Sequence, residues 1–265
     1  MGGYEPFYRD FDLPVMRRLR QDAYGEDIGQ HSWVGADEVR EDVRRLGLVK
    51  SSRLLDLGCG PCGPLTYILS TVGCSGSGLE LNSSAVLAGR ARAIALGVAD
   101  RLAVQEADLN EPLPFEGDSF DAALSLDVVL HVGDRGALFR EIARVVRPRG
   151  RFLLTDAGVV TGCVSNEAIR RRSVHGFTQF VPPGWNESQL EAAGFRVLES
   201  ENRNATLLRN ARGRQAALRA HRLELETLMG AALLEAQCEY LDIVVELAQQ
   251  GALSRVMVLA EVMPR

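Results

Sequence analysis

Short apolar runs alternate with amphipathic stretches through the middle of the chain, and this alternation predicts strands separated by helices. The predicted strands cover 53–57, 74–81, 102–107, 120–126 and 151–156. The helices between them begin near Pro64, Ser83 and Arg135. Strands that alternate with helices form a parallel sheet covered on both faces, so the pattern predicts a doubly wound α/β fold.

The two ends of the chain depart from this alternation. A short helix from Pro14, an irregular loop over 24–33 and an amphipathic helix over 37–46 precede the first strand. After residue 156 we predict an irregular segment, a short helix, a strand, two long helices broken near Gly230, and a last strand over 254–262. Because no linker or repeat interrupts the chain, we expect one domain, 1–265. Its parts are a helical lid (1–49), a core (50–156), a substrate-pocket segment (157–183) and a helical insert before the last strand (204–252).

Composition narrows the functional classes. Hydrophobic residues make up 46% and charged residues 25%, and the net charge is -5, so there is no electrostatic case for nucleic-acid binding. We expect no membrane contact and a cytoplasmic location, because the N-terminus is not a signal peptide and no run reaches a membrane span of about 20 apolar residues. The five cysteines are scattered, and Cys59-x-x-Cys62 has no second pair, so we expect no metal site.

A glycine-rich turn, Gly58-x-Gly60-x-x-Gly63, follows the first predicted strand and leads into a helix. This spacing is typical of dinucleotide sites, but it also occurs in folds that bind S-adenosylmethionine. Asp56, at the end of the strand, would repel a pyrophosphate and attract an ammonium group. Glu80 lies where an acid holds ribose hydroxyls, and Asp108 follows the third strand, where a carboxylate can accept from an adenine amino group.

Taken together, these motifs resemble the class I S-adenosylmethionine-dependent methyltransferases. The resemblance covers residues 50–156 and rests on Leu54–Pro61, Gly78–Leu81, Glu106–Asp108, Leu113–Asp121 and Arg144–Arg151. It implies a seven-stranded Rossmann-like sheet whose last strand is antiparallel, a helical cap, and S-adenosylmethionine as cofactor.

The same resemblance assigns roles to individual residues. It implies that the backbone at Gly58 and Gly60 contacts the methionine part, that Glu80 binds the ribose, and that Asp108 binds the adenine. Asp127 would lie near the methionine amino group, and Asp56 would either contact the cofactor or cap the glycine turn. The full set of expected cofactor-binding residues is Asp56, Gly58, Cys59, Gly60, Glu80, Leu81, Asp108, Leu109 and Asp127.

Methyl transfer from a sulfonium is an in-line displacement, in which alignment supplies much of the acceleration. A neutral amine nucleophile needs no strong base, whereas a hydroxyl usually needs one. The candidate catalytic residues are His131, His175 and Asp156, each of which could instead serve packing or substrate contact.

The loop over 24–33 resembles the lid of sarcosine/dimethylglycine and phosphoethanolamine methyltransferases, which implies an amine acceptor. Aromatic rings can favour a cationic acceptor, but the same rings could instead fasten an N-terminal helix to the core. The expected substrate-binding residues are Tyr24, Gln30, Trp33 and Phe177.

Six arginines between 203 and 222 form either an anion site or a solvated helix face. Apolar residues beside them indicate packing of the insert on the core or on a second copy, so a homodimer is a hypothesis.

The sequence therefore predicts methyl transfer from S-adenosylmethionine to a small molecule, with an amine nitrogen or a hydroxyl oxygen as acceptor atom. The alternative within enzymes is a C- or O-methyltransferase of natural-product biosynthesis that acts on an anionic or isoprenoid acceptor. Two other classes stay open, a nicotinamide-dependent oxidoreductase and a non-catalytic protein that binds S-adenosylmethionine.

Overall fold

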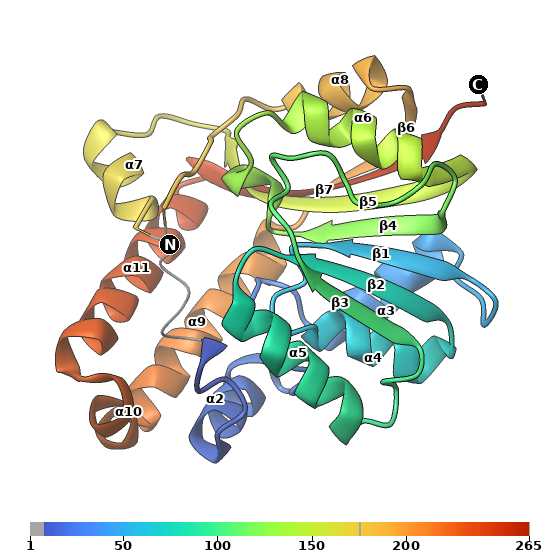
Figure 1. Ribbon diagram of the computed structural model, residues 1–265. Coiled ribbons are helices and arrows are strands. Elements are labelled where there is room, and N and C mark those ends of the chain that lie inside the picture. The colour runs from blue at the N-terminus through green and yellow to red at the C-terminus, as the bar shows by residue number, and fades with distance from the viewer. Residues whose placement is uncertain (1–7, 175, 265) are drawn as a thin grey trace.

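The computed structural model describes residues 8–174 and 176–264, and within these residues seven strands form one sheet (Figure 1). The strand order is β3-β2-β1-β4-β5-β7-β6, with β7 antiparallel to both of its neighbours. The predicted fold class is confirmed, including the antiparallel last strand. The strands are β1 Arg53–Leu57, β2 Ser75–Glu80, β3 Leu102–Glu106, β4 Phe120–Leu126, β5 Val146–Val160, β6 Phe195–Asn202 and β7 Leu253–Val262.

Helices cover both faces of the sheet because side chains on its central strands alternate between two apolar clusters. Leu54 and Leu153 pack with α3, α4 and α5 on one face, whereas Leu55 and Leu154 pack with α6 and α8 on the other. These helices are α3 Ala36–Leu46, α4 Gly63–Val72, α5 Ser83–Ala95, α6 Arg135–Val145 and α8 Trp185–Ala192.

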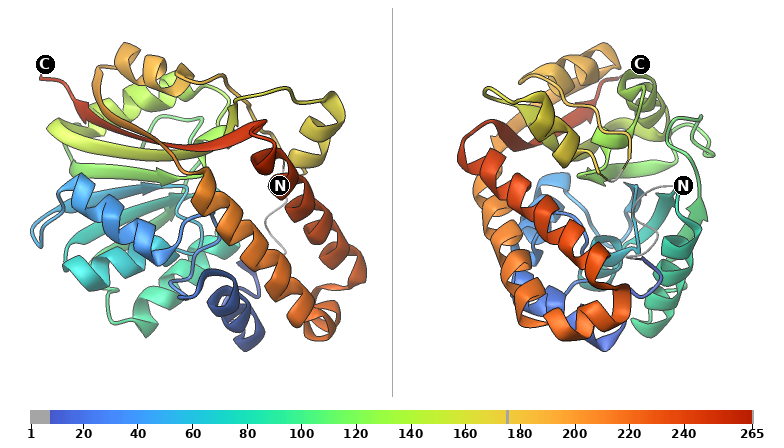
Figure 2. Two further views of the ribbon diagram at one scale, coloured as in Figure 1. Left: turned by 180° about the vertical axis from the view of Figure 1, so that it is seen from behind. Right: turned by 90° about the vertical axis from the view of Figure 1, so that its left-hand side faces the viewer.

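The remaining helices form a cap beyond one end of the sheet (Figures 1 and 2). They are α2 Pro14–Tyr24, α7 Asn166–Arg172, α9 Asn204–Ala220, α10 Arg222–Met229 and α11 Ala231–Gln249. Gly213 lets α9 approach α2 closely, since a Cβ at this position would lie 2.0 Å from the carbonyl oxygen of Ala23. The cap therefore joins the two ends of the chain above the carboxyl edge of β1, β2 and β4.

Three predicted elements differ from the structure. β5 continues past Asp156, because it pairs with β7 as far as Val160. The segment predicted as irregular contains α7, which Ser165 caps through a hydrogen bond from the backbone N–H of Ala168. The insert holds three helices, since the chain also turns at His221. Across 8–174 and 176–264, no helix combines the length and apolar character needed to span a membrane.

Candidate functional site

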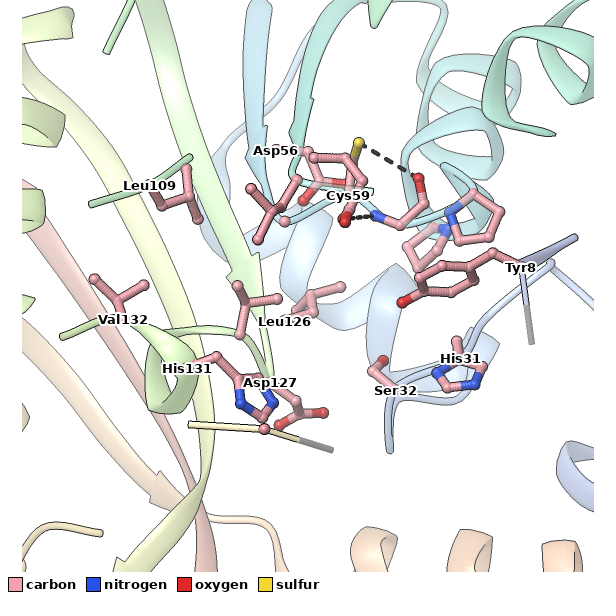
Figure 3. A pocket seen from close by; sticks show the side chains of 18 of the residues that line it. Tyr8, His31, Ser32, Asp56, Cys59, Leu109, Leu126, Asp127, His131 and Val132 are labelled. Carbon is pink, nitrogen blue, oxygen red and sulfur yellow. Dashed lines mark hydrogen bonds between the residues drawn. The ribbon is translucent and has the colours of Figure 1, made fainter. Parts of the chain in front are cut away.

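A cavity of about 330 Å³ opens at the carboxyl edge of the parallel strands, between the glycine turn and the cap (Figure 3). It brings together most of the sequence-predicted residues, which come from six separate segments. Those that line it are Trp33, Asp56, Gly58, Cys59, Gly60, Glu80, Leu81, Asp108, Leu109, Asp127, His131 and Phe177. Tyr24 and Gln30 line a smaller neighbouring cavity of about 50 Å³. His175 lies outside the described residues.

The glycine turn is held by the strand next to it. The backbone N–H groups of Gly58 and Cys59 both donate to the carbonyl oxygen of Leu79, at 2.8 and 3.0 Å. Gly58 has φ +73, and a Cβ there would lie 2.4 Å from a methyl group of Val128, so only glycine fits. The absence of a side chain at Gly58 therefore allows Val128 to pack directly on the turn.

Gly63 serves a different purpose from the one expected of a third fingerprint glycine. A Cβ at Gly63 would lie 1.8 Å from the carbonyl oxygen of Gly29 in the lid loop. Gly63 therefore allows the lid to pack directly on the start of α4.

The two cysteines of the turn are buried, with their sulfurs 3.4 Å apart. The hydrogen bond from Cys62, together with burial, raises the pKa of the Cys59 thiol. The thiol therefore stays protonated and is a poor nucleophile. In the described part of the chain, no three His, Cys, Asp or Glu side chains gather as a metal-binding group.

Asp56 has a buried carboxylate at the cavity wall, and its residue is only 3% exposed. Burial, with a smaller contribution from the charge of Glu80, raises the pKa of Asp56 to about 8. No hydrogen bond to this carboxylate is present among the described residues. It therefore does not cap the glycine turn, and it has the chemistry to receive an ammonium group.

Glu80 and Asp108 present carboxylates with remaining acceptor capacity. Glu80 accepts from the backbone N–H groups of Gly60 and Asn82, each at 2.9 Å, and the two oxygens of a carboxylate together offer about four acceptor sites. Asp108 Oδ1 accepts twice from Asn110, from its backbone N–H and its side-chain amide. Three strand ends thus carry carboxylates, which are hydrogen-bond acceptors. S-adenosylmethionine has three matching donors, its ammonium group, its ribose hydroxyls and its adenine amino group.

Asp127 lines the cavity but is already surrounded by donors. It accepts from Trp33 N–H at 3.1 Å, Thr155 Oγ1 at 2.9 Å and Arg255 Nε at 2.8 Å. Its φ of +61 places it in the left-handed region. Asp127 therefore joins the lid to the last strand, and its charge is compensated by Arg255.

Sequence reasoning missed the buried ion network behind Asp127. Arg255 Nη1 also donates to Glu38 at 2.6 Å, and Glu38 pairs with Arg203 at 2.9 Å. Arg203 in turn binds Asp42 through both of its terminal nitrogens. Helix α3 is thus linked by charge to β7 and to the cavity.

His131 lies in a 3-10 turn, Val129–His131, after β4. Its Nδ1 lies 2.8 Å from the carbonyl oxygen of Phe177, which can only accept, so Nδ1 carries the proton. Burial lowers the pKa of His131, which keeps the ring neutral near pH 7. The lone pair then lies on Nε2, as a general base requires. Phe177 itself is 60% exposed.

Asp156, a candidate catalytic residue, does not line the cavity. It is fully buried and pairs with Arg135 at 2.6 Å. It also accepts from Asn186 Nδ2 and from the backbone N–H of Gly158. These donors occupy its carboxylate, so its position supports a structural role that fastens α6 and α8 to β5.

The lid residues combine anchoring with exposure to a cavity. The Tyr24 hydroxyl donates to Ser32 O at 2.9 Å, and Gln30 bonds the backbone of Glu26 and Ile28. Trp33 is buried, and its ring stacks on Tyr240 with centroids 6.3 Å apart. Both interpretations of the lid, fastening and pocket formation, therefore apply to these side chains.

The cavity-lining side chains that were not predicted include Tyr8, His31, Arg214 and Tyr240. His31 lines both cavities and packs edge-on against Tyr8, with the ring centroids 5.4 Å apart. Only Arg214 had a sequence signal, through the arginine-rich segment. The arginines of that segment differ in exposure. Arg203 is buried in the ion network, whereas Arg212 and Arg219 are exposed.

The fold and the cavity are those of a protein that binds a nucleoside-containing cofactor. The carboxylates that line the cavity match the ammonium group of S-adenosylmethionine and would repel a pyrophosphate. A family model described as a methyltransferase domain matches residues 55–154. The chain is 31% identical over 200 residues to an O-methyltransferase of Aspergillus sclerotiorum, covering 74% of this chain and 73% of that protein. The chain therefore belongs to the S-adenosylmethionine-dependent methyltransferases, as its sequence predicted.

Other similarities span several kinds of acceptor. A glycine/sarcosine/dimethylglycine N-methyltransferase of Actinopolyspora halophila is 28% identical over 164 residues, covering 62% of this chain and 29% of that protein. The structure of phosphoethanolamine N-methyltransferase 2 of Haemonchus contortus superposes with a TM-score of 0.82 at 19% identity, covering all of this chain and 61% of that one. The chain spans from 29% to 73% of the lengths of its curated relatives, most of them below two thirds.

Proposed function

We propose that this protein transfers the methyl group of S-adenosylmethionine to an amine nitrogen or hydroxyl oxygen of a small molecule. The observation that carries the proposal is the cavity, which continues from the acid-bearing strand ends to the side chains of the lid and of α9 and α11. A space of about 330 Å³ enclosed in this way favours a small acceptor over a protein or nucleic acid.

The proposed cofactor contacts follow from the chemistry of the lining groups. Asp56 binds the ammonium group, Glu80 the ribose hydroxyls and Asp108 the adenine amino group, while Leu81 and Leu109 provide apolar walls. The backbone of Gly58, Cys59 and Gly60 contacts the methionine part, and Asp127 orients the lid beside it. When bound, the cofactor supplies an activated methyl group.

Residues of the chain then position the acceptor and take up its proton. His131, held as the neutral Nδ1–H tautomer, removes the proton of a hydroxyl acceptor through Nε2. The buried Trp33 shields the reacting groups from water, the exposed Phe177 lines the same space, and Tyr24 and Gln30 line the smaller cavity beside it. An amine acceptor needs only this positioning.

The experiment is a screen for S-adenosylhomocysteine release with amines, phenols and hydroxy acids, alongside thermal stabilisation by S-adenosylhomocysteine and by NAD. Turnover with at least one acceptor, and stabilisation only by S-adenosylhomocysteine, is expected. Glu80→Ala should abolish stabilisation, whereas the exposed Arg219→Ala should not change it. Stabilisation without any turnover would instead support a non-catalytic binding protein.

We also propose that the protein acts in the cytoplasm and forms a homodimer through its helical insert. Leu223 on α10 is 81% exposed, so it is the position at which this contact can be tested. Sedimentation should give a dimer for the native chain and a monomer for Leu223→Glu. A monomeric native chain would contradict the pairing.

A further inference from the structure

The acceptor end of the cavity carries an uncompensated positive charge. Arg214 on α9 lines both the main cavity and the smaller one, so its side chain lies where the two meet. Within 8–174 and 176–264, no carboxylate forms an ion pair with it. Of the acids along the main cavity, Asp127 is already paired with Arg255, and Asp56, Glu80 and Asp108 belong to the strand ends.

A second arginine reinforces this potential. Arg172 is 5% exposed and donates to the Tyr240 hydroxyl at 2.7 Å, again without an ion pair to a described carboxylate. Tyr240 stacks on Trp33, and the guanidinium of Arg214 lies 4.9 Å from the Trp33 ring centroid. Two arginines therefore flank a pair of cavity-lining aromatic rings.

This arrangement disfavours a purely cationic acceptor. Trp33 could attract a cation through its ring, but Arg214 already makes that contact. An ammonium group brought to the same place would meet the guanidinium at short range, and like charges repel most strongly where water is excluded.

Resting on the proposed function, we propose that the methyl acceptor is a small carboxylic acid whose carboxylate is bound by Arg214. A guanidinium matches a carboxylate with two parallel hydrogen bonds, and one arginine compensates one negative charge. A phosphate monoester carries about 1.5 to 2 negative charges and would be only partly compensated.

The smaller cavity indicates which group of the acceptor lies next to its carboxylate. Next to Arg214 it is lined by Phe11, Met16, Leu19, Leu218 and Met229, and it holds about 50 Å³. A short aliphatic or aromatic group beside the carboxylate fits this apolar space. The amine or hydroxyl of the same molecule then reaches toward the methyl group.

The test compares matched acids and amides that share one nucleophile. The probes are leucine with leucinamide and 4-hydroxyphenylacetate with 4-hydroxyphenylacetamide, and phosphoethanolamine serves as the phosphate probe. The measured quantity is kcat/KM from S-adenosylhomocysteine release. In the native enzyme we expect each acid that reacts to exceed its amide by about tenfold or more, and to exceed phosphoethanolamine.

Variants assign that preference to one side chain. Arg214→Gln should lower kcat/KM for the acid by roughly 10- to 100-fold and leave the amide within about twofold. Arg214→Lys should restore part of the preference, and Arg212→Gln, an exposed change on the same helix, should preserve all of it. Equal losses for acid and amide, a faster amide, or preference for the phosphate probe would overturn the proposal.

Binding separates this inference from the proposed reaction. In a Trp185→Phe background, Trp33 fluorescence of the enzyme saturated with S-adenosylhomocysteine should respond saturably to 4-hydroxyphenylacetate, and Arg214→Gln should abolish the response. If this holds while no probe is methylated, the carboxylate site stands and methyl transfer fails. No response to the acid, or an equal response to the amide, refutes the site.

Discussion

Asp56 should release its proton when the cofactor binds. Burial and the neighbouring Glu80 raise the pKa of Asp56 to about 8, so the carboxyl group is mostly neutral at pH 7 in the free protein. An ammonium group binds the ionised form, and binding at pH 7 should therefore release about 0.9 proton per cofactor.

The same linkage fixes the direction and size of the pH effect on affinity. Ionising a group of pKa 8 at pH 7 costs roughly 1.4 kcal/mol, so the dissociation constant should fall about tenfold as pH rises from 7 to well above 8. The stability of the free protein has the opposite pH dependence. Because the folded-state pKa exceeds that of the unfolded chain, the free energy of unfolding should decline as pH rises between about 4 and 8.

Calorimetric titration with S-adenosylhomocysteine, in two buffers that differ in ionisation enthalpy, measures the released protons directly. Asp56→Asn should remove both the proton release and the pH dependence of affinity. Asp108→Asn, at an exposed carboxylate of the same cavity, should weaken binding but keep the release. A native protein that binds without releasing a proton would refute this account of Asp56.

Three further predictions concern the supports of the site. Arg255→Met leaves the buried carboxylate of Asp127 without its arginine partner and removes one of the two arginines paired with Glu38. It should lower the free energy of unfolding by about 3–5 kcal/mol in urea titrations, and a loss below about 1 kcal/mol would contradict the network. His131→Gln should lower kcat by roughly 100-fold or more for a hydroxyl acceptor and far less for an amine. Since burial lowers the pKa of His131, native activity should fall only when pH drops below about 6.5. Gly63→Ala should displace the lid at Gly29 and cost about 1–3 kcal/mol, measured by thermal unfolding, and unchanged stability would contradict that packing.

The sheet and the acids at its edge could be predicted because their signals are local. A strand such as β1 has its own apolar run, and a parallel sheet brings every strand end to one edge, so Asp56, Glu80 and Asp108 converge without knowledge of any contact. The antiparallel β7 followed from the family resemblance, since pattern alone does not set topology.

The ion network behind the site could not be predicted in the same way. Arg255 and Asp127 are separated by 128 residues, and Arg255 and Glu38 by 217. Nothing adjacent to Arg255 in the sequence distinguishes a buried arginine from the many exposed ones. The buried ion pair of Asp156 could not be predicted for a related reason, because its partner Arg135 resembles an ordinary residue at a helix start.

The contacts of Trp33 show why the proposed acceptor pocket could not be predicted from the sequence. Its backbone N–H donates to the carboxylate of Asp127, and its carbonyl oxygen accepts from the side chain of Asn210 on α9. Its ring lies against Tyr240 and Arg214. The lid and the helical insert are therefore one structural unit around this side chain. Fastening the lid and lining the cavity are compatible roles for the loop, because the contacts that anchor Trp33 also place it beside Arg214. The acceptor recognition that we propose therefore depends on contacts between the lid and the helical insert, which lie far apart in the sequence.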